Sequence, residues 1–291
     1  MKRGSFLAAF CAAMIMSVPA SAAVQGDLNA DESADAADVL LLRDFLTVQP
    51  DLTLQDWAAV DLNQDNRLNA VDLALLKGLI LPKGPKVLEP KETVHYGEAT
   101  FYGGGYEGGC AMLDPVSTDY WITAMNLPDY NCAELAGAFL EVTGELGTIQ
   151  VLVTDLLPEG KKGDLDLYVD AFPLIAPAEK GRVPVSWKII PLDTAEDAPM
   201  RYRYKEGSSP FWCGVQVLNH RYPIETLEYL NEDGDFVALP RRNYNYFEAM
   251  SGLGEGPFTF RITDIYGQSV IDEGIPFTPD ETQEGKAQLP L

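Results

Sequence analysis

The chain has 291 residues, of which 44 are acidic and 21 are basic, so its formal net charge at pH 7 is −23. Phosphate-rich partners require basic surfaces, and this charge therefore argues against binding to nucleic acid or to an anionic membrane. The length allows two or three domains, each with its own hydrophobic core.

The N-terminus has the pattern of an export signal. A basic start at Met1–Arg3 precedes a short apolar run, Phe6–Met16, and an Ala-rich end at Pro19–Ala23. This pattern predicts a secretory signal peptide over residues 1–22, cleaved after Ala22. The apolar run is too short to span a bilayer. We therefore expect a secreted, extracellular, soluble protein.

Two loops of the same pattern follow, Asp27–Asp38 and Asp61–Asp72. Side-chain oxygens recur at loop positions 1, 3, 5, 9 and 12, and position 7 offers a backbone carbonyl, which is the spacing that calcium requires. The expected ligands are Asp27, Asn29, Asp31, Ser33, Asp35 and Asp38 in the first loop, and Asp61, Asn63, Asp65, Arg67, Asn69 and Asp72 in the second. The sequence thus predicts two calcium ions.

Both loops depart from the common helix-loop-helix calcium motif. They close with Asp instead of Glu, and each leads into a short apolar helix, at 39–43 and 73–77. An acidic, solvated segment is the alternative, but ten matched side-chain ligand positions argue against it. The repeat over residues 24–81 closely resembles a dockerin. The resemblance implies calcium-dependent binding to a cohesin domain of a cellulosomal scaffold. Residues 82–95, rich in proline and charge, predict an extended linker.

The rest of the chain is β-rich and divides into two blocks. Short runs of β-branched and aromatic residues between turn residues predict strands. In the first block, 96–193, they are Glu98–Tyr102, Trp121–Met125, Phe139–Thr143, Ile149–Leu156 and Val183–Ile190, and Asp166–Ile175 is expected to be a short helix. In the second, 199–291, they are Met200–Tyr204, Trp212–Asn219, Thr226–Leu230, Phe236–Leu239 and Phe258–Thr263, with hairpin turns at 231–235 and 266–267. This spacing is typical of an antiparallel sandwich.

Six segments of these two blocks resemble bacterial expansins. They are Gly97–Tyr106, Thr154–Gly160, Gly163–Leu167, Tyr204–Trp212, Val217–His220 and Asn243–Phe247. The resemblance runs from Tyr96 to about the C-terminus. It implies a six-stranded double-psi β-barrel followed by an immunoglobulin-like cellulose-binding domain. It also implies that the protein loosens plant cell walls without hydrolysis. We expect a monomer.

The resemblance also implies which residues contact glycan. Thr100, Asp155 and Asp166 match polar positions of the barrel groove, and Tyr102 and Tyr106 lie in a matching groove segment. Phe211, Trp212 and Tyr244 match a flat aromatic strip in the second domain, with Lys205 nearby. Leu157, where an aromatic residue is common, and Phe211, where a tryptophan is common, depart from the family pattern.

The aromatic pair has two possible interpretations. Neighbouring residues of a regular strand point to opposite faces, so Phe211 and Trp212 share a face only in a loop or bulge. The adjacent Pro210 and Gly207 favour such a loop. The alternative is that Trp212 belongs to the sandwich core, where a buried tryptophan is common. Tyr244, considered alone, is typical of a packing residue.

The two aspartates raise the question of catalysis. Asp166 aligns with the general acid of related inverting endoglucanases, and a pair of carboxylates can support hydrolysis. The place of the base in those enzymes is held here by Gly103–Gly105, and the first carboxylate beyond it is Glu107. Asp155 could instead cap a turn before Pro158. Three hypotheses stay open: a non-hydrolytic expansin, a weak endoglucanase that uses Asp166, and a purely binding protein.

Cysteines and other motifs add further expectations. After removal of Cys11 with the signal, we expect Cys110 and Cys132 to form a disulfide and Cys213 to be buried. The histidines, His95 and His220, have no metal-ligand spacing, which argues against a zinc site. The Gly103–Gly108 segment matches a dinucleotide-binding pattern only literally, because no βαβ unit surrounds it.

Overall fold

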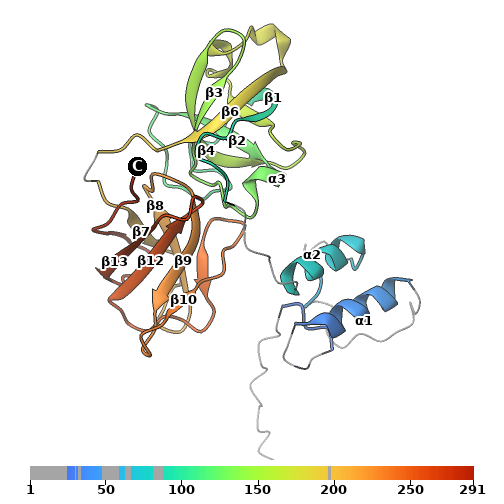
Figure 1. Ribbon diagram of the computed structural model, residues 1–291, viewed down its shortest axis with the longest axis vertical. Coiled ribbons are helices and arrows are strands. Elements are labelled where there is room, and N and C mark those ends of the chain that lie inside the picture. The colour runs from blue at the N-terminus through green and yellow to red at the C-terminus, as the bar shows by residue number, and fades with distance from the viewer. Residues whose placement is uncertain are drawn as a thin grey trace, which may run out of the picture. The chain divides into compact units, whose positions relative to one another are not determined.

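The computed structural model describes residues 25–29, 31, 34–47, 59–62, 67–80, 88–195 and 198–291. The chain forms two compact units, residues 1–86 and 87–291 (Figure 1). The predicted signal peptide at 1–22 lies outside the described residues. Within the described ranges, no helix combines the length and the apolar character needed to cross a membrane.

The first unit is built on two helices, α1 (Ala36–Thr47) and α2 (Ala70–Ile80). Leu28, Leu42, Val60 and Leu76 form its buried centre. Each helix begins one residue after position 9 of its loop, and the side-chain oxygen at position 9 accepts the backbone N–H two residues on. The Asp35 carboxylate accepts from Ala37 N at 2.7 Å, and the Asn69 amide oxygen accepts from Val71 N at 2.7 Å. The expected helices are therefore confirmed, with N-caps that the loops themselves supply.

The second unit begins with a closed six-stranded barrel. Its strands are β1 (His95–Tyr102), β2 (Trp121–Asn126), β3 (Phe139–Thr143), β4 (Thr148–Leu157), β5 (Leu165–Tyr168) and β6 (Val183–Ile190). They pair in the order β1-β5-β2-β4-β3-β6, and the β1/β5 and β2/β4 pairs are parallel. A short helix, α3 (Leu127–Tyr130), follows β2. This is the expected double-psi β-barrel.

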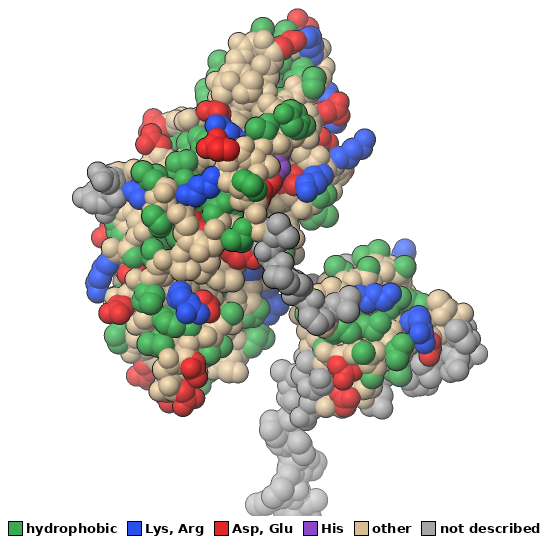
Figure 2. All heavy atoms as spheres, viewed as in Figure 1, with side chains coloured by type: hydrophobic (Ala, Val, Ile, Leu, Met, Phe, Trp, Pro, Cys, Tyr) green, Lys and Arg blue, Asp and Glu red, His purple; other side chains and the backbone are tan. Residues whose placement is uncertain are grey.

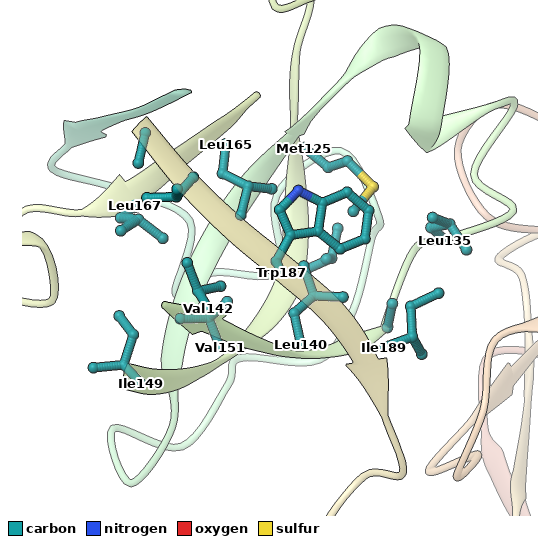
Figure 3. Close-up of a cluster of buried hydrophobic side chains, with 14 of the residues drawn as sticks. Met125, Leu135, Leu140, Val142, Ile149, Val151, Leu165, Leu167, Trp187 and Ile189 are labelled. Atoms are coloured by element: carbon teal, nitrogen blue, oxygen red, sulfur yellow. The ribbon is translucent and has the colours of Figure 1, made fainter. Parts of the chain in front are cut away.

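Side chains fill the barrel interior. Trp187 is 1 % exposed, and Figure 3 shows its indole among Met125, Leu140 and Leu165. The indole N–H donates to Gly163 O at 2.8 Å, so the polar atom of this buried ring is satisfied. His95, at the start of β1, stacks on the same indole with ring centroids 3.9 Å apart.

The loop before β5 crosses β1 at two glycines. Gly163 has a φ of +92°, and a Cβ on it would meet the backbone of Tyr96 and lie 3.3 Å from Gly97 Cα. Only glycine allows both the positive φ and the close approach of the two backbones. The crossing places β5 between β1 and β2.

The expected helix at Asp166–Ile175 is wrong in its first half. Residues Leu165–Tyr168 form β5, which pairs with β1 on one side and β2 on the other. Only the three residues Phe172–Leu174 form a turn of 3₁₀ helix, η1, and a second such turn, η2, covers Ala178–Lys180. The reason is non-local, because pairing with two neighbouring strands determines the conformation of β5.

The C-terminal part of this unit is a sandwich of two four-stranded sheets. One sheet has the order β11-β8-β7-β14 and the other β10-β9-β12-β13. The strands are β7 (Arg201–Tyr204), β8 (Cys213–Leu218), β9 (Ile224–Leu230), β10 (Phe236–Ala238), β11 (Phe247–Ala249), β12 (Phe258–Asp264), β13 (Ser269–Ile275) and β14 (Thr282–Glu284). The expected turns at 231–235 and 266–267 join β9 to β10 and β12 to β13. Acidic side chains gather at the tip of the first turn, where Glu232, Asp233 and Asp235 are exposed (Figure 2).

The barrel and the sandwich share contacts. Tyr222 and Ile265 of the sandwich belong to the same buried cluster as the barrel core. Residues 82–87 of the predicted linker lie outside the described residues. Lys91, in the described part of the linker, contacts the sandwich. Its Nζ lies 4.4 Å from the ring centroid of Tyr222 and donates to Gln268 at 3.3 Å. The end of the linker therefore packs on the sandwich instead of running free.

Candidate functional site

Four residues from four adjacent strands form one row across the barrel. In the strand register, Thr100 of β1 is opposite Asp166 of β5, Asp166 is opposite Ala124 of β2, and Ala124 is opposite Asp155 of β4. Residues opposite each other point to the same face of a sheet. Because Leu165 and Leu167 fill the interior, Asp166 and its partners point outward. We call Thr100, Asp166, Ala124 and Asp155 the polar row.

A β-bulge in β4 brings Asp155 into the polar row. Thr123 pairs with Val153, but the next residue, Ala124, pairs with Asp155, so Thr154 is the extra residue. Such a bulge reverses the alternation of the side chains that follow it. Val153 points into the core, and without the extra residue Asp155 would have pointed inward as well. The predicted Asp155 and Asp166 are therefore brought to one face.

Asp166 lies in a partly buried environment. The Thr100 hydroxyl donates a hydrogen bond to its carboxylate. Burial raises the pKa of Asp166 above the usual range, and the charge of Glu159 adds to this, whereas the Thr100 hydrogen bond and the charge of Arg182 lower it. Burial disfavours the ionised carboxylate, and this effect dominates.

Asp155 has a different set of partners. Its Oδ1 accepts two backbone N–H groups, from Cys110 at 2.9 Å and from Leu156 at 2.9 Å. Gly109 lies directly against it, since a Cβ there would be 2.9 Å from Asp155 Cβ. Asp155 does not cap a turn before Pro158 through these bonds, as the alternative had suggested. Instead, it ties the loop after β1 to β4.

The predicted tyrosines flank the row. Tyr102 pairs with Tyr168, two positions beyond Thr100 and Asp166 in the register. Burial raises the pKa of Tyr102 well above its usual range, and the charge of Asp155 raises it further. Tyr106 contacts the edge of Tyr168, with centroids 4.9 Å apart, and donates to Tyr120 O at 2.8 Å. The row is thus bordered by tyrosine rings.

The second candidate surface is a tight turn in the sandwich. Ser209 and Trp212 form an isolated β-bridge, with Ser209 N donating to Trp212 O at 2.6 Å. Pro210 and Phe211 occupy the turn between them, and Phe211 is 82 % exposed. The structure therefore places Phe211 and Trp212 in a loop, the case in which neighbouring side chains can share a surface.

Trp212 lies on the outside of the β7–β8 sheet. A Cβ on Gly214 would be 3.4 Å from Trp212 Cη2 and 3.1 Å from Lys205 Cβ, so the indole lies over this glycine and next to Lys205. Lys205 Nζ is 5.8 Å from the ring centroid of Tyr244. Neither Trp212 nor Tyr244 belongs to the buried core cluster of the described sandwich. We call Phe211, Trp212, Lys205 and Tyr244 the aromatic strip.

Tyr244 is held in the strip by polar contacts. Its hydroxyl donates to Glu248, whose carboxylate also forms an ion pair with Arg242 at 2.7 Å. Burial, followed by the hydrogen bond and charge of Glu248, raises the pKa of Tyr244 to about 12. Tyr244 is half-buried, so one part of the ring packs and another part is accessible.

In the described part of the chain, Cys110 and Cys132 are not joined by the expected disulfide. Both are exposed, and Cys213 is buried as expected. A disulfide requires matched Cα positions and directions, which the presence of both cysteines in one domain does not establish. Cys110 lies instead beside Asp155: burial raises the pKa of its thiol, and the hydrogen bond and charge of Asp155 raise it further.

The closing aspartates of the two calcium-type loops accept equivalent backbone hydrogen bonds. In the first, Leu28 N and Asp35 N donate to the two carboxylate oxygens of Asp38, each at 2.8 Å. In the second, Leu62 N and Asn69 N donate to Asp72 at 3.1 and 2.9 Å. Asp38 and Asp72 are fully buried. Buried carboxylates in loops lined by further oxygen side chains fit a hard cation such as calcium.

Only some of the expected calcium ligands belong to the described residues. Asp27 is buried and Asp31 lies close by, with Asp31 N donating to Asp27 Oδ1 at 3.2 Å. Ser33, Asn63 and Asp65 lie outside the described residues. Within the ranges that the structure describes, no three His, Cys, Asp or Glu side chains form a metal-type cluster. The two loops and their closing aspartates thus remain predicted ligand sets.

Several residues around the polar row escaped sequence reasoning. Tyr168 follows Asp166 by two residues, so strand alternation would have placed both on one face if β5 had been recognised. Glu159 and Cys110 gave no such signal, because loops bring them to Asp166 and Asp155. Leu157, which departs from the aromatic residue common in expansins, is the last residue of β4 and is half-buried.

A double-psi β-barrel joined to an immunoglobulin-like sandwich, with an outward polar row and an aromatic strip, defines an expansin-type protein. Known proteins are similar to this chain in sequence. Expansin-YoaJ of Bacillus subtilis (strain 168) is 38% identical over 216 residues, which are 71% of this chain and 91% of the relative. Expansin-like protein 2 of Dictyostelium discoideum is 28% identical over 213 residues, or 70% of this chain and 51% of the relative.

Solved structures and a family model agree with these relatives. A mutant of the Clavibacter michiganensis expansin in complex with cellohexaose aligns with a TM-score of 0.61 and 32% identity, covering 67% of this chain and 98% of that chain. The apo form of that expansin aligns equally well. Residues 25–81 match the dockerin type I domain. The chain belongs to the expansin family and carries a dockerin type I domain at its N-terminus.

The buried environment of Asp166 predicts a pH-dependent stability difference. A carboxyl group whose pKa is raised by folding stabilises the protein below its unfolded pKa of about 4, and this contribution is lost as the pH rises through the folded pKa. Asparagine does not ionise, so Asp166→Asn should melt at a higher temperature than the wild type at pH 7. The difference should disappear near pH 3. Asp170→Asn, at an exposed residue, is the control and should leave the melting temperature unchanged at both pH values. If Asp166→Asn is less stable than the wild type at pH 7, burial does not raise the pKa of Asp166 in the folded protein.

Proposed function

We propose that this chain is a secreted, cellulosome-associated expansin, which binds cellulose and loosens plant-wall polysaccharides without hydrolysing them. In this proposal, residues 24–81 attach the protein to a scaffold and 82–95 form the linker. Residues 96–193 act on the glycan, and 199–291 bind cellulose. The protein acts as a monomer.

The aromatic strip is the observation that carries this proposal. Phe211 is 82 % exposed, on a turn that also presents Trp212. Flat aromatic rings suit the C–H faces of a glucan chain and lose little side-chain freedom on binding. The Clavibacter michiganensis expansin, a similar protein, has been solved in complex with cellohexaose. A β-linked glucose chain is therefore the ligand that we propose for the strip.

The proposed action of the polar row is to grip sugar hydroxyl groups. Thr100, Asp155 and Asp166 offer hydroxyl and carboxylate oxygens on one face. Charge-assisted hydrogen bonds of this kind are about twice as strong as neutral ones. Glu107, the first carboxylate after Gly103–Gly105, lines a cleft together with Lys205 and Tyr246, so it faces the sandwich rather than Asp166. This placement supports a site that has an acid without an opposing base.

The second candidate, a weak inverting endoglucanase, has one observation in its favour. Asp155 and Asp166 flank Ala124, so their Cα atoms are two strand spacings apart, about 10 Å. Inverting glycosidases separate their carboxyl groups by about 6.5–9.5 Å. The environments also differ, since Asp166 is partly desolvated and Asp155 accepts two backbone N–H groups. An acid and a base need different pKa values, and different environments of the two carboxyl groups produce such a difference.

Sugar release separates these two functions. We expect no new reducing ends from cellulose, xylan or mixed-linkage glucan, together with a measurable loss of filter-paper strength. Asp166→Asn should abolish the weakening, because asparagine keeps the shape but loses the charge that grips the sugar. Asp170→Asn, at an exposed residue outside the polar row, is the matched control. Time-linear product from the wild type that disappears in Asp166→Asn would establish the endoglucanase instead.

Trp212 provides the test of cellulose binding. Truncation of a Trp at the centre of a binding surface costs about 2 kcal/mol or more, so Trp212→Ala should weaken cellulose binding about thirtyfold. Its melting temperature should change little, whereas a core Trp would cost about 3–5 kcal/mol of stability. Phe236→Ala, on the opposite sheet, is the control. Tyr244→Ala should cause a smaller loss. Tight binding by Trp212→Ala in a pull-down with crystalline cellulose would refute the role of the strip.

The dockerin region should hold two calcium ions and bind a cohesin. Dockerin type I domains generally bind calcium, and the closing aspartates Asp38 and Asp72 are buried in equivalent loops. Calcium supplies the positive charge that offsets the converging carboxylates. The two helices, of 12 and 11 residues, are too short to be stable alone. Metal binding would therefore contribute folding free energy.

Calcium titration of the full chain tests this region. We expect two ions per chain by calorimetry, and chelation should abolish cohesin binding together with part of the helical circular-dichroism signal. Asp27→Ala and Asp61→Ala should each remove one ion. Asp44→Ala, on α1 and paired with Arg43, should retain both. Unchanged cohesin binding in a chelator would contradict the proposal.

A further inference from the structure

One loop of the barrel is held from two sides. We call the segment Gly109–Asp114 the bridging loop. On the barrel side, Cys110 N donates to Asp155 Oδ1 at 2.9 Å, and Ala111 N donates to Thr154 O at 3.0 Å. The bridging loop thus contacts both the bulge residue and the carboxylate that the bulge directs outward. A displacement of this loop would break its hydrogen bond to Asp155.

The sandwich holds the other side of the same loop. Gln216 Nε2 donates to Ala111 O at 2.9 Å, and Asn245 Nδ2 donates to the same oxygen at 3.1 Å. Arg203 donates to Met112 O and forms an ion pair with Asp114. Arg203 also donates to Gln216 Oε1, which fixes the orientation of that amide. The three side chains come from β7, β8 and the segment before β11.

These contacts are buried, which makes them selective for one loop position. Gln216 is fully buried and Asn245 is 4 % exposed. A buried carbonyl that loses its donors costs about 1–3 kcal/mol, so Ala111 O strongly favours the position in which both amides reach it. The bridging loop has no strand or helix of its own, and Gly109 and Met112 have φ values of +53° and +47°. Its conformation therefore depends on external partners.

We propose that Gln216, Arg203 and Asn245 are positioning residues that fix Asp155 of the polar row through the bridging loop. This inference rests on the proposed function and deepens it. The sandwich has two roles in it: the aromatic strip binds the glucan chain, and its buried amides set the geometry of the barrel residue that grips the chain. The two roles use different residues, so substitutions can separate them.

The chain contains its own reporter of the loop position. Cys110 is exposed and lies beside Asp155, and of the three cysteines in the described chain only Cys132 is also exposed. In a Cys132→Ser background, Cys110 is therefore the thiol that reacts with an alkylating reagent such as iodoacetamide. The hydrogen bond and charge of Asp155 disfavour its thiolate, the reactive form. Release of the loop from Asp155 should raise its reactivity.

The experiment compares Gln216→Met combined with Arg203→Met against Gln283→Met combined with Arg201→Met. Methionine keeps the volume of both side chains, and the control pair lies on strands of the same sheet. Asp155 disfavours the Cys110 thiolate, so loss of this contact favours the reactive form. We expect Cys110 alkylation severalfold faster in the first pair and unchanged in the second. Filter-paper weakening should fall at least severalfold in the first pair, while cellulose binding stays at the wild-type level.

Two further variants keep the outcome clear. Gln216→Met alone should accelerate alkylation in the same direction by a smaller factor, which covers the case in which the double variant fails to fold. Arg203→Lys in place of Arg203→Met should restore part of the filter-paper weakening, because lysine can still pair with Asp114. Alkylation of Cys110 at the wild-type rate in folded Gln216→Met would overturn the inference. If the wild type weakens no substrate, the proposed function fails, and the alkylation rates still decide whether the loop is held from the sandwich.

Discussion

The close passage of two backbones at Gly97 and Gly163 is the constraint on which the barrel depends. Side chains at these positions would force the loop before β5 away from β1. With both residues glycine, β5 enters the sheet between β1 and β2, and the Trp187 indole N–H satisfies Gly163 O in the core. The polar row exists because of this arrangement. Thr100 and Asp166, which are 66 residues apart, become direct neighbours in a parallel pair.

A second local irregularity completes the row. The bulge at Thr154 adds one residue to β4, and this residue turns Asp155 to the outer face. Bulges are often found where a side chain must be redirected at a functional site. The bridging loop then uses Asp155 and Thr154 O as its anchors, and the sandwich anchors the loop in turn. The barrel, the loop and the sandwich thus form one connected structure around the row.

Sequence reasoning worked where local patterns carry the information and failed where distant contacts decide. The calcium-type loops, most barrel strands and the sandwich hairpins follow from periodicity and turn residues. The segment at Asp166–Ile175 was misassigned because only pairing with β1 and β2 makes Leu165–Tyr168 a strand. The expected Cys110–Cys132 disulfide rested on both residues lying in one domain, which says nothing about their separation, and the structure shows the two thiols exposed and not bonded to each other.

The resemblance to expansins predicted the residues of the candidate site, but the sequence did not contain their arrangement. It could not show that Asp155 needs a bulge to face outward. Nor could it decide whether Phe211 and Trp212 share a surface, because this depends on a turn closed by Ser209. Local sequence suggested the turn through Pro210 and Gly207, and the fold positioned it beside Lys205 and Tyr244.

The barrel itself does not exclude hydrolysis. Gly105, with a φ of +98°, lies so close to β2 that a Cβ would be 2.9 Å from Ile122 Cδ1, so a side chain there would strain the loop. Gly103 is different: its φ is not positive, and a Cβ on it would meet no atom within 4 Å. A carboxylate could be accommodated at that position without steric cost. For the proposed glucan-binding site, the side chains on the loop after β1 would decide between gripping and cleaving the chain, while the register that aligns Asp155 with Asp166 is compatible with either chemistry.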